Sequence, residues 1–178
     1  MNEKSNSLEE TVRFHGHLCP GLVIGYRAAK EAMASLNASR AEDEELIAIV
    51  ENDSCSVDAI QWLTGCTFGK GNFFFRDYGK QVFTLALRPS GDAIRLAFKN
   101  RKAEAYQSAR TREEQIQWIL DAPIQEVFDI RKMTIALPDE ARIHQSVVCD
   151  RCGEEVMASR TVKDGDLALC RSCHKAAP

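Results

Sequence analysis

The alternation of apolar and polar residues in the first 64 positions predicts three helices and one buried strand. A capping box, Ser7 with a glutamate three residues later, indicates a short helix over residues 8–15. An apolar stripe at helical spacing predicts a second helix over 21–36. Residues 46–50 are apolar throughout and include β-branched side chains, which is typical of a buried strand. A third helix is expected over 57–63, soon after this strand.

The chain up to residue 148 is expected to continue as a mixture of strands and helices. Strands are predicted over 73–75, 81–87 and 93–98, and helices over 100–109, 111–123 and 123–128. A turn at 77–80 should connect the first two of these strands. A closing hairpin is predicted from 131–137 and 141–148, around Pro138. Helices mixed with consecutive strands indicate an α+β fold, with a mixed or antiparallel sheet and packed helices.

Metal-binding chemistry is concentrated first in residues 15–21, His-Gly-His-Leu-Cys-Pro-Gly. In an extended segment, His15, His17 and Cys19 would point to the same side, because they lie two residues apart. Imidazole and thiolate are borderline-soft ligands suited to zinc, nickel, copper or iron. The alternative is that these residues pack in the core, where free cysteine is common. Two histidines and a cysteine so close together favour a metal or catalytic role.

Cys55 is expected beside this segment, because it lies at a strand-to-helix junction, where functional residues often gather. The N-terminal dipole of the next helix should lower the pKa of its thiol. We expect His17, Cys19 and Cys55 to bind one transition-metal ion, zinc or nickel, with the fourth position left to water or substrate. A carbonyl or a carboxylate, with Asp53 and Asp58 as candidates, should hold the second ring nitrogen of His17.

The glycine-rich loop at 65–72 contains two further candidates, Cys66 and Lys70. Its spacing does not match a phosphate-binding P-loop, since the residue after the lysine is glycine rather than serine or threonine. Two interpretations stay open. The loop can form a backbone nest for a carboxylate or phosphate with Lys70 as anion partner, or it can simply turn between a helix and a strand. Cys66 can equally be a packing residue.

Four cysteines in the last 30 residues form the most specific motif of the chain. They are Cys149, Cys152, Cys170 and Cys173, arranged as two Cys-x2-Cys pairs separated by seventeen residues. Two such pairs can present four thiolates to one tetrahedral zinc ion. So short a segment cannot build a core of its own, so the zinc would stabilise a zinc-ribbon or treble-clef module. We therefore expect an α+β domain at 1–147 and a structural zinc module at 148–178.

Composition and charge narrow the remaining functions. The 178 residues are 44% hydrophobic and 28% charged, which is typical of a globular protein. The formal net charge of −3 provides no overall electrostatic attraction to nucleic acid or anionic membranes. The last 30 residues carry five basic and five acidic side chains, which favours contact with a partner protein over nucleic acid. No signal peptide or membrane span is visible, and seven cysteines in that context favour a cytoplasmic protein.

Four motifs, in this order, resemble the FmdE component of formylmethanofuran dehydrogenase. They are Phe-His-Gly-His-Leu-Cys-Pro-Gly at 14–21, Cys55-x2-Asp58-x2-Gln61, Thr-Gly-Cys-Thr-x-Gly-Lys-Gly-Asn at 64–72 and Asp-Tyr-Gly-Lys at 77–80. The resemblance covers most of residues 8–148, and the motifs together are far more specific than any one of them.

The resemblance implies an α+β domain, a homodimer and a C-terminal zinc module. It implies a metal cleft lined by His17, Cys19 and Cys55, with His15, Asp58, Cys66 and Lys70 nearby. In archaeal methanogens the family accompanies a molybdenum or tungsten enzyme that interconverts carbon dioxide and formylmethanofuran, and similar stand-alone proteins occur in bacteria. Three functions therefore stay open: an accessory component of a larger redox-enzyme complex, a stand-alone metalloenzyme, and a non-catalytic zinc-module regulator or scaffold.

Overall fold

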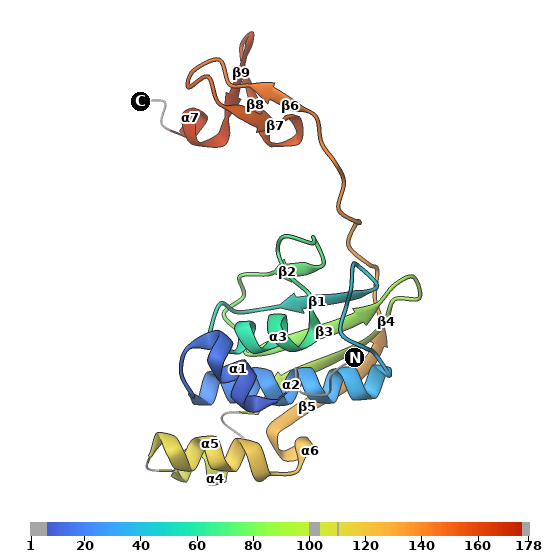
Figure 1. Cartoon of the computed structure of the whole chain (residues 1–178), viewed down its shortest axis with the longest axis vertical. Helices are drawn as coiled ribbons and strands as arrows, with labels where there is room; N and C mark the ends of the chain where they lie inside the picture. The colour runs from blue at the N-terminus through green and yellow to red at the C-terminus, as the bar shows by residue number, and fades with distance from the viewer. Residues whose placement is uncertain (1–6, 100–103, 110, 176–178) are drawn as a thin grey trace. The chain divides into compact units, whose positions relative to one another are not determined.

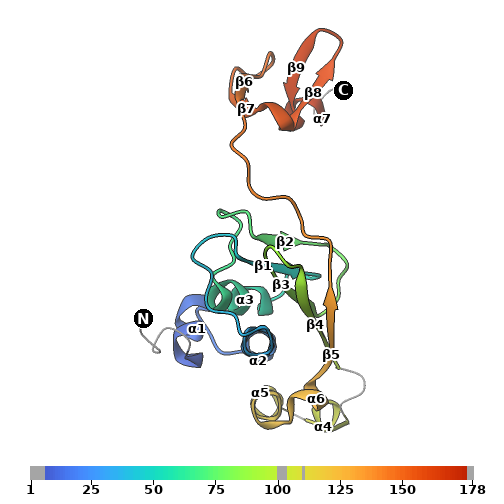
Figure 2. The same cartoon turned by 90° about the vertical axis from the view of Figure 1, so that its right-hand side faces the viewer.

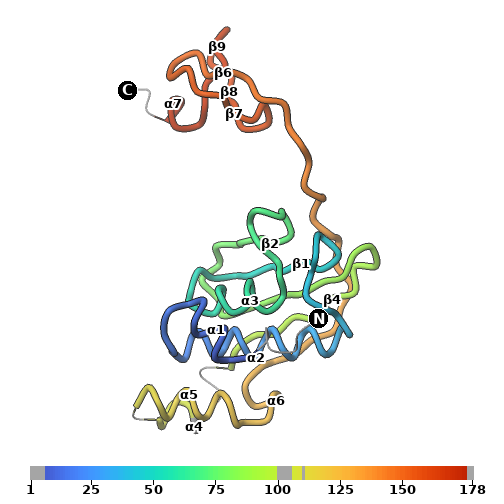
Figure 3. The backbone as a smooth tube through the Cα atoms, in the orientation of Figure 1, coloured from blue at the N-terminus to red at the C-terminus, as the bar shows by residue number. Residues whose placement is uncertain are grey.

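The computed structural model describes residues 7–99, 104–109 and 111–175. The chain divides into two compact units, Met1–Glu140 and Ala141–Pro178 (Figures 1 and 3). This division lies before the boundary expected at 147/148, because the strand Ser146–Val148 pairs within the second unit. Among the described residues, no helix is both long and apolar enough to span a bilayer.

A five-stranded mixed sheet forms the centre of the first unit, in the order β2–β1–β3–β4–β5 (Figure 1). The strands are β1 (Leu46–Val50), β2 (Phe73–Phe75), β3 (Val82–Leu87), β4 (Asp92–Phe98) and β5 (Phe128–Thr134). β1 and β2 are parallel, and the other neighbours are antiparallel. Every residue of β1 is buried, as expected for a strand that is apolar on both faces and has a neighbour on each side. The expected α+β fold with a mixed sheet is confirmed.

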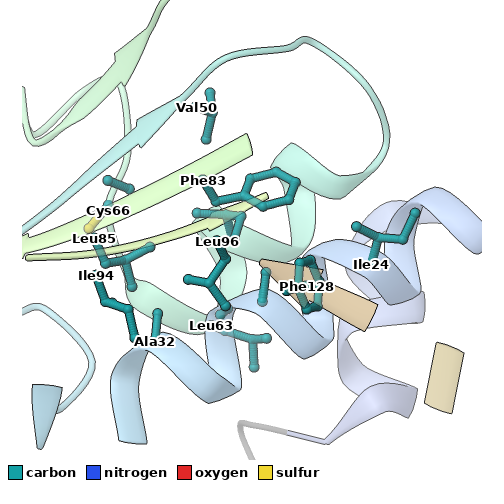
Figure 4. Packing of buried hydrophobic residues seen from close by; sticks show 14 of the residues in the cluster. Ile24, Ala32, Val50, Leu63, Cys66, Phe83, Leu85, Ile94, Leu96 and Phe128 are labelled. Atoms are coloured by element: carbon teal, nitrogen blue, oxygen red, sulfur yellow. The ribbon is translucent and has the colours of Figure 1, made fainter. Parts of the chain in front are cut away.

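Helices cover one face of this sheet. The described helices of the first unit are α1 (Leu8–His15), α2 (Pro20–Leu36), α3 (Ser56–Thr64), α4 (Glu104–Ser108), α5 (Arg112–Asp121) and α6 (Ile124–Val127). α2 and α3 lie directly against the sheet (Figure 2), and the core between the layers contains Leu63, Phe83, Leu85 and Leu96 (Figure 4). Each such side chain contributes about 1.5–3 kcal/mol when fully buried. Part of the helix expected at 100–109 is present as α4, whereas residues 100–103 lie outside the described residues.

One expected strand pairing is wrong: the closing hairpin of 131–137 with 141–148 is absent from the described residues. The turn expected at 77–80 does connect β2 to β3, but these two strands are not neighbours in the sheet, because β1 lies between them. β5 begins at Phe128, whose ring packs against Phe98 of β4, and the two strands pair in full register from these phenylalanines onward. Local alternation indicates a strand but does not identify its partner.

The second unit consists of two small hairpins and a short helix. β6 (Ser146–Val148) pairs with β7 (Glu155–Met157), and β8 (Thr161–Asp164) pairs with β9 (Leu167–Cys170). A 3₁₀ turn (Ala158–Arg160) connects the hairpins, and α7 (Arg171–Lys175) follows β9. The buried cluster of this unit contains only Cys149, Leu169 and Cys170 among its described residues, so apolar packing contributes little to its stability.

Candidate metal centres

The connection between α1 and α2 carries three of the candidate ligands. His15 is the last residue of α1, which ends at Gly16 in the left-handed conformation, φ 100°. Cys19 is the N-cap of α2, and its Sγ accepts a hydrogen bond from the Leu22 N–H at 3.3 Å. Pro20 then begins the helix, as its fixed φ favours. The segment is therefore not extended throughout, and a helix end rather than simple alternation positions His15.

The fourth candidate, Cys55, reaches the same place because α2 and α3 approach unusually closely. A Cβ atom added to Gly25 of α2 would lie 2.1 Å from the carbonyl oxygen of Ser56. A Cβ atom on Gly21, one turn earlier, would lie 3.2 Å from Cβ of Cys55. These two glycines therefore let the N-terminus of α3 approach Cys19. Figures 1 and 3 show the α1–α2 and β1–α3 connections at the same end of the first unit.

The structure brings four potential ligands together: His15, His17, Cys19 and Cys55. Their ligand atoms all lie within 4.8 Å of one another, whereas ligand atoms around a tetrahedral zinc ion are about 3.3–3.8 Å apart. His15 Nε2 is 4.0 Å from Cys19 Sγ, and the two imidazole centroids are 4.5 Å apart. Small side-chain adjustments would bring these atoms to coordination distance. His15, expected only near the cleft, is thus a full member of the donor set, which is then four rather than three.

His15 is oriented by Asp58. Its Nδ1 lies 2.7 Å from Asp58 Oδ2, and because a carboxylate accepts, Nδ1–H is the donor. In the neutral imidazole, the form that binds metals, this arrangement leaves the lone pair on Nε2. A carboxylate that holds the remote nitrogen of a metal-binding histidine is a common feature of metal sites. The pairing differs from the expected one, in which this carboxylate holds His17. No short-range pattern could have assigned it to His15, since the two residues are 43 positions apart.

The two thiols of the cluster affect each other. Cys19 is 2% exposed, Cys55 is half-buried and His17 is exposed. The pKa of Cys55 is raised, first by burial and then by the neighbouring Cys19 thiol. This is opposite to the lowered pKa expected from the helix dipole, because loss of hydration and a second sulfur outweigh partial charges at the α3 N-terminus. A bound cation reverses this preference, since it stabilises both thiolates.

A polar network that no short sequence motif predicts holds the backbone around Cys55. The buried Asn52 accepts at Oδ1 from the Ser54 hydroxyl at 2.7 Å and from the Ser56 hydroxyl at 3.2 Å. Its Nδ2 donates to the Lys80 carbonyl at 2.8 Å, and Gln81 donates to Ser54 Oγ at 2.8 Å. The Asn-Asp-Ser sequence after a buried strand is a turn signal, but only the fold shows that the residues leading into β3 complete the network.

Cys66 and Lys70 do not join the cluster. Cys66 is fully buried in the core (Figure 4), and its thiol donates to the Leu46 carbonyl at 3.3 Å. Burial raises its pKa to about 11. Lys70 Nζ donates to the Ala41 carbonyl at 3.0 Å. The packing interpretation of Cys66 therefore describes the structure, and Lys70 serves to hold the loop that follows α2.

The loop at 65–72 is held by hydrogen bonds between its own residues. Its backbone N–H groups are used internally: Thr67 donates to Asn72 Oδ1 at 2.9 Å, Lys70 to Thr67 Oγ1 at 3.4 Å and Gly71 to the Phe68 carbonyl at 3.2 Å. An anion nest needs such groups to converge on a ligand instead. The turning-loop interpretation is the one that these bonds support.

The second cluster contains the four C-terminal cysteines, whose sulfur atoms all lie within 4.8 Å of one another. Cys149 Sγ accepts from the Cys170 N–H at 3.2 Å, and Cys170 Sγ accepts from the Cys173 N–H at 3.3 Å. Hydrogen bonds from the backbone N–H groups of Cys152, Cys170 and Arg151 lower the pKa of Cys149 to about 6. The Cys170 thiol raises the pKa of Cys173 to about 12. Four sulfur atoms this close together could be ligands of one metal ion, as in a four-thiolate site.

The fold and these two clusters define a class of protein: an α+β domain with a His/Cys centre, followed by a four-cysteine unit. The sequence profile of one family, described as "FmdE, Molybdenum formylmethanofuran dehydrogenase operon", matches residues 14–129. The chain therefore belongs to the FmdE family, as its motifs indicate.

Two relatives extend this comparison. A crystal structure of an FmdE-like protein, named for tungsten formylmethanofuran dehydrogenase and taken from Syntrophus aciditrophicus, aligns with a TM-score of 0.75 at 27% identity. The alignment covers 96% of this chain and 91% of that one. A "Probable S-adenosyl-L-methionine-binding protein" from Archaeoglobus fulgidus is 30% identical over 188 positions, covering 90% of this chain. The chain spans only 50% of the length of that relative.

Proposed function

We propose that this chain is a metal-binding protein of the FmdE type, with one transition-metal ion in the core cluster and a structural zinc ion in the second unit. The observation that carries the proposal is the convergence of His15, His17, Cys19 and Cys55, from α1, the α1–α2 connection and the start of α3. The donor set is two imidazoles and two thiols, which suits zinc and nickel better than magnesium or calcium.

The ligands of the core cluster differ in exposure, which suggests what the site can do. Cys19 is buried and His15 is held by Asp58, whereas His17 is exposed on the connection between two helices. His17 is therefore the ligand that water or a substrate could displace most easily. The remaining three ligands would hold the ion while the fourth position is open, as in catalytic zinc sites.

Metal analysis of the full chain tests the core site. We expect two metal ions per chain in the native protein and one in a His17→Ala/Cys19→Ser double variant that still folds. Cys66→Ser is the matched control, since it removes a thiol that lies outside both clusters. An unchanged metal content in the folded double variant would contradict the proposal.

A stand-alone metalloenzyme is the second candidate, and the exposure of His17 favours it over a scaffold. X-ray absorption of the metal-loaded core site distinguishes the two. A three-residue donor set plus a light, exchangeable ligand is expected for an enzyme. Four protein ligands that stay unchanged when imidazole or cyanide is added would favour a structural or regulatory role.

We also propose a homodimer. Several apolar side chains of the second unit are exposed: Ile143, Val147, Val148, Met157 and Leu167. A contact with a second chain through these side chains would remove apolar surface from water and so stabilise the dimer. Light scattering should then give twice the chain mass of 19.9 kDa.

Purification of the native protein distinguishes an accessory role from independent function. Co-purification with a large redox enzyme would support the accessory role, and recovery of the dimer alone would support independent function.

A further inference from the structure

A cavity of about 160 Å³ lies next to the core cluster. Val50 at the end of β1, Phe75 at the end of β2 and Val57 in the first turn of α3 all line it. Its position beyond the carboxyl ends of two parallel strands is a common ligand-binding location in sheets with helices. A cavity of about 150 Å³ can hold one benzene molecule, so this one admits a single ring or a compact branched group.

Three phenylalanine rings form the apolar wall of this cavity: Phe68, Phe73 and Phe75. Phe73 is 4% exposed and anchors the group, whereas Phe68 is 66% and Phe75 is 42% exposed. The centroids of the Phe68 and Phe73 rings are 5.2 Å apart and the rings are inclined at 51°, so the exposed Phe68 ring packs on the buried Phe73 ring at the cavity wall. The face of a phenyl ring carries partial negative charge and attracts cations.

The charged groups of the cavity have one sign. Asp53 and Asp58 line it, and no basic side chain is among its described lining residues. Lys70, from the neighbouring loop, is bound to the Ala41 carbonyl instead. The N-terminus of α3 contributes about half a positive charge, which is less than the two carboxylates. The cavity therefore favours a cation and disfavours a phosphate or carboxylate.

We propose that this cavity binds a small quaternary ammonium group, between the three phenyl rings and the two carboxylates. Such a group needs no hydrogen-bond acceptor, and surrounding it with aromatic faces and negative charge is an efficient way to replace its hydration. The cavity also connects to the core cluster through Asp58, whose Oδ2 is 2.7 Å from His15 Nδ1. The further statement that the ligand lies beside a metal ion rests on the proposed function.

Choline and 3,3-dimethylbutan-1-ol form a matched pair of probes, since they share one shape and differ in charge. Each is titrated into the ¹⁵N-labelled full chain at constant chloride concentration, and binding is followed by amide chemical shifts. We expect choline to bind at least about fivefold more tightly, as a cation–π contribution of roughly 1 kcal/mol gives. Equal affinities, or tighter binding of the alcohol, would overturn the proposal.

Two variants locate the binding. Phe68→Leu and Asp53→Asn should each weaken choline binding about threefold or more and leave the alcohol nearly unchanged. Tyr78→Leu and Asp77→Asn are the matched controls, because both residues are exposed and do not line the cavity. Equal losses in the variants and their controls would refute this location.

A final experiment distinguishes choline binding in the cavity from binding at the core cluster. The choline titration is repeated with the Cys19→Ser variant, whose substitution lies outside the cavity lining. Retained choline affinity would show that the cavity binds choline without an intact core cluster. The proposed metal-binding function is tested separately, by the metal analysis. Loss of choline binding in this folded variant would contradict a cavity built from Phe68, Phe73 and Phe75.

Discussion

At the residue scale, the two buried sulfurs of the first unit differ in what surrounds them. Cys19 faces two imidazoles and a second thiol, whereas Cys66 faces a backbone carbonyl and apolar side chains. Both belong to family-like motifs, so motif membership alone does not distinguish a ligand from a packing residue. The two thiols differ in their surroundings because Cys19 caps α2 with its Sγ 4.0 Å from His15 Nε2, whereas the Cys66 thiol donates to a carbonyl of β1.

Asp58 provides the first prediction at this scale. Asp58→Ala should weaken metal binding at the core site about 10- to 100-fold, because His15 loses the partner that orients its ring and raises its basicity. Asp58→Asn should recover part of this loss, since the amide oxygen can still accept from Nδ1. Competition with a chelator of known affinity measures the effect.

The control for this prediction is Asp53→Asn, a neighbouring carboxylate with no contact to His15 among the described hydrogen bonds. It should leave the metal affinity unchanged. If Asp58→Ala and Asp53→Asn behave alike, the His15–Asp58 pair has no role in metal binding.

Cys66 provides the second prediction. Its pKa rises from 9.0 to about 11 on folding because the thiol is buried, so above pH 9 the unfolded chain releases a proton that the folded chain retains. Stability should therefore fall between pH 9 and 11, by at most about 1.4 kcal/mol per pH unit from this group. Urea unfolding of the native chain and Cys66→Ala, compared across this range, isolates the effect, since other groups cancel. Parallel pH profiles of the two proteins would rule it out.

The sequence predicts three of the four members of the core cluster, because His17, Cys19 and Cys55 have ligand chemistry and adjoin helix starts. It does not assign His15 or its partner Asp58, because that contact joins residues 43 positions apart. The Asn52 network escapes prediction for the same reason, since it needs Lys80 and Gln81 from beyond β2 in the chain. Local patterns predict which residues are reactive, and the fold decides which of them meet.

At the element scale, the close contact between α2 and α3 determines whether the core cluster can form. Gly25→Ala would place a Cβ atom 2.1 Å from the Ser56 carbonyl oxygen, so the α3 N-terminus and Cys55 must shift. In an open helix the same change would stabilise by about 0.5–1 kcal/mol. Here we expect a net loss of about 1–3 kcal/mol from overpacking, together with weaker core metal binding. Chemical denaturation and metal analysis measure the two effects.

Gly69→Ala is the matched control for this prediction. Nothing lies within 4 Å of a Cβ atom at that position, so stability and metal content should stay unchanged. A Gly25→Ala protein as stable and as rich in metal as the Gly69→Ala protein would show that the α2–α3 contact is not limiting.

Helix ends were predictable and strand partners were not. Both capping boxes predicted helix starts correctly, at Ser7 and at Thr111, because each motif is complete within four residues. The position of β1 between β2 and β3 depends on strands that are distant in the sequence. The strand 46–50 is apolar on both faces, which implies a buried central strand but leaves its neighbours open.

At the scale of the whole molecule, the two units are stabilised by different means. The first unit has a large apolar core between one sheet face and α2, α3 and α5. The second has only Cys149, Leu169 and Cys170 in its described buried cluster, and two of these are candidate ligands. We therefore expect a unit of this size, with so little apolar burial, to need a bound metal for folding. The units should therefore respond differently to metal removal.

We expect a strong chelator to unfold the second unit and leave the first one folded. In ¹H–¹⁵N spectra of the full chain, amide signals from β6 to β9 should lose their dispersion, while those of β1 to β5 persist, because the sheet needs no ion for its core. Adding zinc should restore the dispersed signals.

Two variants serve as controls for this prediction. The Cys152→Ser/Cys173→Ser variant should have an unfolded second unit even without chelator. The Cys19→Ser variant, which alters only the core cluster, should keep that unit folded. Dispersed signals from β6 to β9 in metal-free protein would mean that its hairpins are stable without zinc.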